Sequence, residues 1–184
     1  MPLGALLWAA PSRGQHITGA RRDRVVVSGL RDGEFALCFD RVDDTAILRE
    51  GLGIERDQKC CDGIIFYAYQ QTRVICLVEM KHTNFKEAIN QIGVVRNSLY
   101  SMWQEECARY KNIDAIKKLF KDAIWRAYVY QSSATDKHEK EQCLTGLCKL
   151  FGKGNIDVSR EDDITNFLRY GAMPKKQQEI RKRR

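Results

Sequence analysis

The chain has 184 residues, of which 43% are hydrophobic and 30% are charged, and its formal net charge is +7 at pH 7. This length and balance predict one globular domain with a full hydrophobic core and argue against a disordered chain. No apolar run reaches the roughly 20 residues of a membrane-spanning helix, so we expect no membrane partner. Residues 1–10 are mildly apolar but short, which favours a packed or frayed terminus over a signal peptide.

The positive charge lies at the two ends of the chain. Residues 1–24 hold four arginines against one acidic residue, and the body that follows is close to neutral. The end of the chain has six basic residues against Glu179: Lys175, Lys176, Arg181, Lys182, Arg183 and Arg184. Basic tails suit contacts with nucleic-acid phosphates, although solvated tails have the same composition. We therefore expect a single domain over residues 1–173 and a basic tail over residues 174–184.

The seven cysteines do not have the spacing of a zinc site, because no pair is separated by two residues. His138, Cys143 and Cys148 recur every five residues, and a helix would turn them away from one another. An odd number of cysteines without a secretory signal predicts free, mostly buried thiols in a reducing cytoplasm.

In chain order, the first predicted elements are a strand over residues 34–39 and a short helix over residues 43–51. Residues 63–69 are rich in β-branched and aromatic side chains, and residues 73–81 follow after a short polar break. These two strands are expected to form a hairpin. The second contains five consecutive apolar residues, which is typical of a central strand covered on both faces.

After the hairpin, apolar residues at three- and four-residue spacing from Phe85 to Met102 predict a long amphipathic helix. Asn84 and Glu87 have the spacing of a capping box at its start. Five further elements are expected: a helix near residues 113–120, a strand over 123–130, a helix over 137–151, a strand over 155–158 and a helix between Ser159 and Gly171. This order predicts an α/β fold in which helices flank a mixed β-sheet.

Three charged residues are expected to meet at one end of the hairpin. Asp62 begins its first strand, while Glu79 and Lys81 end the second. Strand side chains alternate, so Glu79 and Lys81 face the same way and Met80 faces the other. Two carboxylates suit a divalent cation that polarises a phosphate and activates water. A lysine can orient that water or stabilise negative charge.

The pattern of residues 61–66, Cys-Asp-Gly-Ile-Ile-Phe, and residues 78–81, Val-Glu-Met-Lys, resembles the PD-(D/E)XK nuclease superfamily. The resemblance extends from about residue 43 to residue 130 and implies the restriction-endonuclease-like fold. It also implies catalytic roles for Asp62, Glu79 and Lys81, with Mg²⁺ or Mn²⁺ bound by Asp62, Glu79 and the main-chain carbonyl of Met80. Cys61 replaces the motif proline, a position that the superfamily often varies.

Relatives in the superfamily suggest two further site residues. A glutamate on a preceding helix corresponds to Glu50, with Glu34 as a lesser candidate, and a polar residue on the following helix corresponds to Gln91. Both Glu50 and Gln91 could equally be ordinary surface or edge positions. Lys59 and Lys86 flank the site and could contact phosphates, as could the basic tail. His82 is expected on the face opposite Lys81.

The resulting hypothesis is a cytoplasmic nuclease that acts on DNA more than on RNA, in prokaryotic defence or DNA processing by resemblance. The plainest alternative is that Glu79 and Lys81 form a surface salt bridge. A nucleic-acid-binding or protein-interaction module on the same fold, a subunit activated by a partner chain, and a homodimer also remain open.

Overall fold

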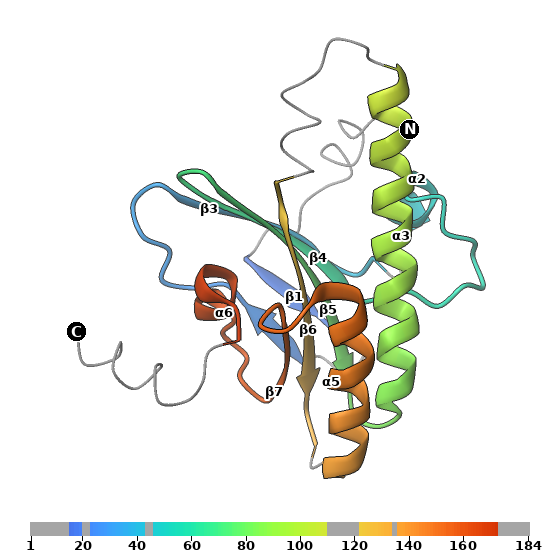
Figure 1. Ribbon diagram of the computed structural model, residues 1–184, viewed down its shortest axis with the longest axis vertical. Helices are drawn as coiled ribbons and strands as arrows, with labels where there is room; N and C mark the ends of the chain where they lie inside the picture. The colour runs from blue at the N-terminus through green and yellow to red at the C-terminus, as the bar shows by residue number, and fades with distance from the viewer. Residues whose placement is uncertain (1–14, 20–22, 43–45, 110–121, 134–135, 173–184) are drawn as a thin grey trace.

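The computed structural model describes residues 15–19, 23–42, 46–109, 122–133 and 136–172. In chain order its elements are β1 (His16–Thr18), β2 (Arg24–Val26), β3 (Glu34–Phe39), α2 (Ala46–Gly51), β4 (Gly63–Tyr69), β5 (Thr72–Lys81), α3 (Phe85–Arg109), β6 (Ile124–Gln131), α5 (Lys137–Phe151), β7 (Ile156–Ser159) and α6 (Thr165–Tyr170). Within these ranges β3 to β7 form one mixed sheet in that order, and β1 and β2 form a separate antiparallel pair (Figure 1). The expected α/β class with a mixed sheet and flanking helices is confirmed.

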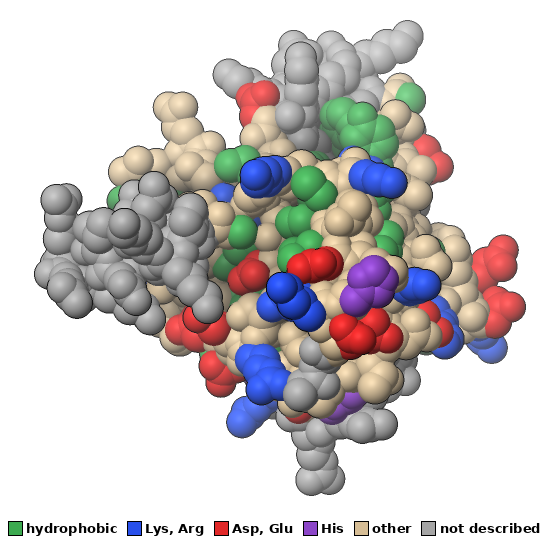
Figure 2. Space-filling view, turned by 60° about the horizontal axis from the view of Figure 1, so that its bottom comes forward, with side chains coloured by type: hydrophobic (Ala, Val, Ile, Leu, Met, Phe, Trp, Pro, Cys, Tyr) green, Lys and Arg blue, Asp and Glu red, His purple; other side chains and the backbone are tan. Residues whose placement is uncertain are grey.

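The sheet changes from antiparallel to parallel at its central strand, β5. Strands β3, β4 and β5 pair antiparallel, whereas β5, β6 and β7 pair parallel through the crossover helices α3 and α5. The carboxyl ends of β5 and β6 lie together, because Lys81 is in register with Gln131. Figure 2 looks toward this lower edge of the molecule, where acidic, basic and histidine side chains gather.

Both faces of the sheet are covered, as the apolar run in β5 predicts. One face packs against α3 and α5, whose buried side chains include Ile92, Leu99 and Leu147. The β1–β2 pair and α6 cover the other face, with Ile17, Val25 and Leu168 buried. Figure 1 shows α3 and α5 side by side in front of the sheet. Residues Val74 to Val78 are buried throughout, since alternate side chains enter the two layers.

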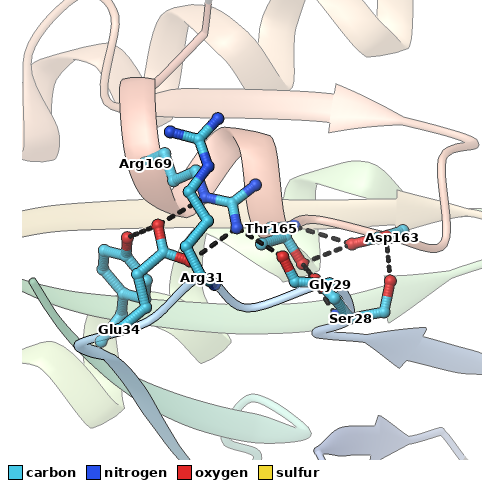
Figure 3. Close-up of polar contacts among 8 residues, drawn as sticks. Ser28, Gly29, Arg31, Glu34, Asp163, Thr165 and Arg169 are labelled. Atoms are coloured by element: carbon cyan, nitrogen blue, oxygen red, sulfur yellow. Dashed lines mark hydrogen bonds and ion pairs between the residues drawn. The ribbon is translucent and has the colours of Figure 1, made fainter.

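A buried ion pair fastens α6 to the start of β3 (Figure 3). Arg169 donates from Nε to Oε1 of Glu34 over 2.7 Å and from Nη2 to the carbonyl of Gly29 over 2.7 Å. The Tyr67 hydroxyl also donates to Glu34, as does the main-chain N–H of Arg31. The hydrogen bond from Arg169 lowers the pKa of Glu34 from 4.5 to about 2. The Glu34 side chain is only 1% exposed, and these donors offset its desolvation.

A second set of hydrogen bonds joins the residues before α6 to the end of β2. The Thr165 hydroxyl donates to the Ser28 carbonyl and accepts from the Ser28 N–H, both over 2.8 Å. The Asp163 carboxylate accepts from the Thr165 N–H over 2.9 Å. Backbone pairing of Val26 with Asp162 and Ile164 continues the contact. Helix α6 begins at Thr165, within this contact, and is therefore shorter than the helix expected between Ser159 and Gly171.

Most of the predicted elements are confirmed within one or two residues. The helix over 137–151 has the predicted bounds, and α3 runs on to Arg109. Strands β1 and β2 were missed because each has only three residues. The predicted helix near 113–120, residues 43–45 and the tail over 174–184 lie outside the described residues. No helix among the described ranges is long and apolar enough to cross a bilayer.

The Glu34–Arg169 pair predicts a specific loss of stability in acid. Because the folded pKa of Glu34 is about 2 and its ordinary value is 4.5, the stabilisation is complete above about pH 4.5 and is lost as pH falls toward 2. Urea unfolding should show Glu34→Gln less stable than wild type at neutral pH by about 1.5–3 kcal/mol. That difference should shrink through the acid window. A difference that stays constant with pH would contradict this role for the pair.

Candidate active site at the end of the β4–β5 hairpin

The register of the hairpin brings Asp62 and Glu79 to the same end. Gly63 pairs with Val78, so Asp62, which immediately precedes β4, lies beside the part of β5 that carries Glu79. Oδ2 of Asp62 accepts a hydrogen bond of 2.6 Å from the main-chain N–H of Met80. Asp62 is 7% exposed and Glu79 is 2% exposed. Two buried carboxylates therefore lie at the same end of the hairpin.

Lys81 lies directly against Glu79, on the side of the sheet that α3 covers. Its Nζ is 2.7 Å from Oε1 of Glu79 and 3.8 Å from Oε2 of Glu87, and it donates to Oε1 of Gln91. The Lys81 side chain is 13% exposed. A charge-assisted contact at this degree of burial is stronger than an exposed salt bridge, because solvent screens it less. The structure thus brings Glu79 and Lys81 into contact and places Asp62 at the same end of the hairpin.

Gln91 connects the lysine to the loop before β4. Its side-chain carbonyl accepts from Lys81, while its Nε2 donates to the main-chain carbonyl of Cys60 over 3.1 Å. The Gln91 side chain therefore links helix α3 to the end of β5 and to the loop before β4. The structure places Gln91 at the site, as the sequence suggested.

Of the two candidate glutamates from earlier in the chain, the structure places Glu34 away from the site. Glu34 pairs in register with Tyr69 at the opposite end of β4 and binds Arg169, so the expectation of a site role for Glu34 is wrong. Its position on β3 makes it part of the contact with α6. Glu50 lies on α2 with an exposed side chain, and none of the contacts described above involves it.

Glu87 is a site residue that the sequence pattern concealed. The Asn84–Glu87 spacing suggested a capping box, but the Glu87 N–H donates to the main-chain carbonyl of Asn84. The Glu87 carboxylate instead lies 3.8 Å from Lys81 and 3.3 Å from Lys59. The available signal was a glutamate in the first turn of the helix that follows the strand ending at Lys81.

Of the basic residues expected to contact phosphate, the structure describes Lys59 and Lys86 but not the basic tail. The Lys59 side chain is 70% exposed and reaches Glu87, and Lys86 is exposed on the first turn of α3. Lys175, Lys176, Arg181, Lys182, Arg183 and Arg184 lie outside the described residues. Lys59 thus borders the site at the protein surface through its contact with Glu87.

Arg49 positions the loop that leads into Asp62, and nothing in the sequence pattern marked it. The residue is 9% exposed on α2. Its guanidinium donates to the Gln58 carbonyl over 2.6 Å, to Cys60 Sγ over 3.3 Å, and to the Glu55 carbonyl. An arginine in a short helix usually looks like a surface residue, but here the side chain is largely buried and its guanidinium binds two loop carbonyls.

The donor set of the site suits a hard divalent cation. Among the described residues no three His, Cys, Asp or Glu side chains come together as a metal site. Asp62, Glu79 and the Met80 carbonyl would supply oxygen ligands, and Mg²⁺ commonly binds through one or two carboxylates and retains water. Burial and the Glu79 carboxylate raise the pKa of the neighbouring Cys61 thiol well above its usual value. Cys61 therefore remains a neutral packing residue.

Comparison of the chain with protein-family models, with curated proteins and with solved structures gave no match. The function must therefore be argued from the chemistry of the site. Figure 2 shows acidic and basic side chains in contact with each other at the lower end of the molecule.

Arg49→Met tests whether the guanidinium holds the Asp62 loop. The substitution keeps most of the side-chain length but leaves the Glu55 and Gln58 carbonyls without their donor. We expect the free energy of unfolding, measured with urea, to fall by about 2–3 kcal/mol. Arg56→Met, an exposed position in the same loop, is the matched control and should change it little. Equal effects of the two substitutions would contradict the role given to Arg49.

Proposed function

We propose that this chain is a metal-dependent nuclease of the PD-(D/E)XK type, with a restriction-endonuclease-like core, and that DNA is its main substrate. The observation that carries the proposal is the convergence of Asp62, Glu79 and Lys81. The Lys81 ammonium lies 2.7 Å from Glu79, and the Asp62 carboxylate receives the N–H of the residue between them. The change from antiparallel to parallel pairing at β5, with α3 packed behind it, also supports the proposal.

Each residue of the site has a role in phosphodiester hydrolysis under this proposal. Asp62, Glu79 and the Met80 carbonyl would hold Mg²⁺ or Mn²⁺, which supplies a polarised phosphate and a more acidic bound water. Lys81 would orient the attacking water or stabilise the negative charge that develops on the phosphate. Gln91 and Glu87 keep the Lys81 ammonium in place, so the lysine does not have to be ordered during the reaction.

One observation favours a second candidate, a module that binds nucleic acid or protein without cleaving. The Lys81 ammonium is already matched by Glu79, Gln91 and Glu87, so a stable ionic cluster exists without any cation. A subunit that becomes active when a partner chain or second copy binds is a variant of the same idea. Catalysis and metal binding are therefore tested separately.

Cleavage of supercoiled plasmid and of single-stranded DNA and RNA, with magnesium and with manganese, tests the reaction. Asp62→Asn and Lys81→Ala should each lower the wild-type rate by about 100-fold or more, because each removes a charge that acts in the transition state. Lys153→Ala, at an exposed position in the loop before β7, should cut at the wild-type rate. Wild type that is inert on every substrate, or variants that cut equally well, would refute the enzyme proposal.

Binding of Mn²⁺ by the purified chain tests the metal site without reference to activity. A cation that binds only the folded chain raises stability, by about 2.7 kcal/mol when its concentration is 100 times the dissociation constant. Thermal unfolding of wild type should therefore shift upward with manganese, and that of Asp62→Asn should shift far less. The same shift in both chains would place any bound manganese elsewhere.

A further inference from the structure

A second cluster of reactive side chains lies on the other side of β5 from Lys81. Nε2 of His82 is 3.0 Å from Oδ2 of Asp23, and the Ser132 hydroxyl contacts the same ring at Nδ1, with its oxygen 3.4 Å from Nε2. Asp23, His82 and Ser132 are thus joined in an unbroken chain through the imidazole. The sequence gives no sign of this cluster, because its members are separated by 58 and 49 intervening residues.

The cluster is assembled where three segments end or begin. His82 follows the last residue of β5, Ser132 follows the last residue of β6, and Asp23 precedes β2. Strand alternation places Lys81 toward α3 and His82 toward the β1–β2 pair. The carboxyl ends of neighbouring parallel strands are where open α/β sheets usually bind ligands. Helix α3 begins three residues after His82, so the positive end of its dipole lies at the same edge.

Main-chain contacts hold the histidine and the serine in fixed relation. The Ser132 N–H donates to the Lys81 carbonyl over 3.3 Å, and the Ser133 hydroxyl donates to the His82 carbonyl over 2.7 Å. The Gln131 amide donates to the Ser133 carbonyl over 2.8 Å. The cluster nevertheless reaches solvent, since the His82 and Asp23 side chains are 29% and 25% exposed. A held but accessible arrangement is what a reactive centre requires.

We propose that Ser132 is a nucleophile activated by His82 and oriented by Asp23, and that this centre reacts with neutral acyl esters. A carboxylate can only accept, so the ring donates its Nε2–H to Asp23 and Nδ1 accepts from the serine hydroxyl. A nucleophile hydrogen-bonded to a base that is itself oriented by a third group is the arrangement that activates serine. The negative charge of Asp23 disfavours an anionic phosphodiester here and favours an uncharged ester.

The reaction balances without a cofactor. The Ser132 oxygen forms a bond to the ester carbonyl carbon while its proton moves to Nδ1 of His82. The bond from that carbon to the leaving alcohol oxygen breaks, and His82 returns the proton to the alcohol. Water then attacks the acyl-serine ester by the same proton path, releasing a carboxylic acid and restoring the Ser132 hydroxyl.

Labelling of the full chain with a fluorophosphonate, followed by peptide mass spectrometry, tests the proposal. The Ser132 oxygen should form a bond to phosphorus with loss of fluoride, giving one modified serine in folded wild type and none after heat denaturation. Ser132→Ala should abolish the label. His82→Gln can keep hydrogen bonds to both neighbours but cannot take up the proton, so it should slow labelling by about 100-fold or more. Ser101→Ala, an exposed serine on α3, should label at the wild-type rate.

The outcomes separate a reactive centre from a structural contact. A cluster that merely ties the β1–β2 pair to the sheet would leave Ser132 unlabelled in folded wild type, and that result overturns the proposal. Label at a different serine, or equal labelling of His82→Gln, also overturns it. Release of one equivalent of p-nitrophenolate from p-nitrophenyl acetate in an initial burst would support it. The result does not depend on nucleic-acid cleavage, because the labelling reaction contains no nucleic acid and no divalent cation.

Discussion

The antiparallel register between β4 and β5 is the constraint on which the site depends. With Gly63 opposite Val78, Asp62 and Glu79 reach the same end of the hairpin, and both are nearly excluded from solvent. A shift of one residue would turn Glu79 and Lys81 into the opposite layer, among the residues that face the β1–β2 pair. Burial of an apolar strand on two faces thus also determines where the charges meet.

Buried charges in this fold are held by partners from several elements. The Glu79–Lys81 pair is braced by Gln91 and Glu87 on α3, whereas Arg49 on α2 holds the loop that delivers Asp62. At the opposite end of β4, Glu34 is held by Arg169 of α6. In each case a desolvated ion is stabilised by contacts from a different secondary-structure element, so the cost of desolvation is offset only in the complete fold.

The residues that the patterns predicted are those whose signal is local. The run from Val74 to Val78 predicted a central strand, and the polar break before it predicted the hairpin that brings Asp62 and Glu79 together. The position of Gln91 could be predicted because helical spacing placed it at the edge of an apolar stripe. The sequence pattern predicted that Glu87 caps a helix and that Glu34 belongs to the site. Both predictions failed because the partners of these side chains, Lys59 for Glu87 and Arg169 for Glu34, lie far away in the chain.

The sequence by itself determined the α/β class, the hairpin and the convergence of Asp62, Glu79 and Lys81, since these follow from alternation and from short-range chain connections. Only the tertiary structure decided that Arg49 holds the Asp62 loop and that Glu87 faces Lys81. It alone joined Asp23, His82 and Ser132, whose strands and loops are brought together by a parallel crossover and by the docking of the β1–β2 pair. Local periodicity records which face a side chain occupies, but contacts between distant segments depend on how complete layers pack.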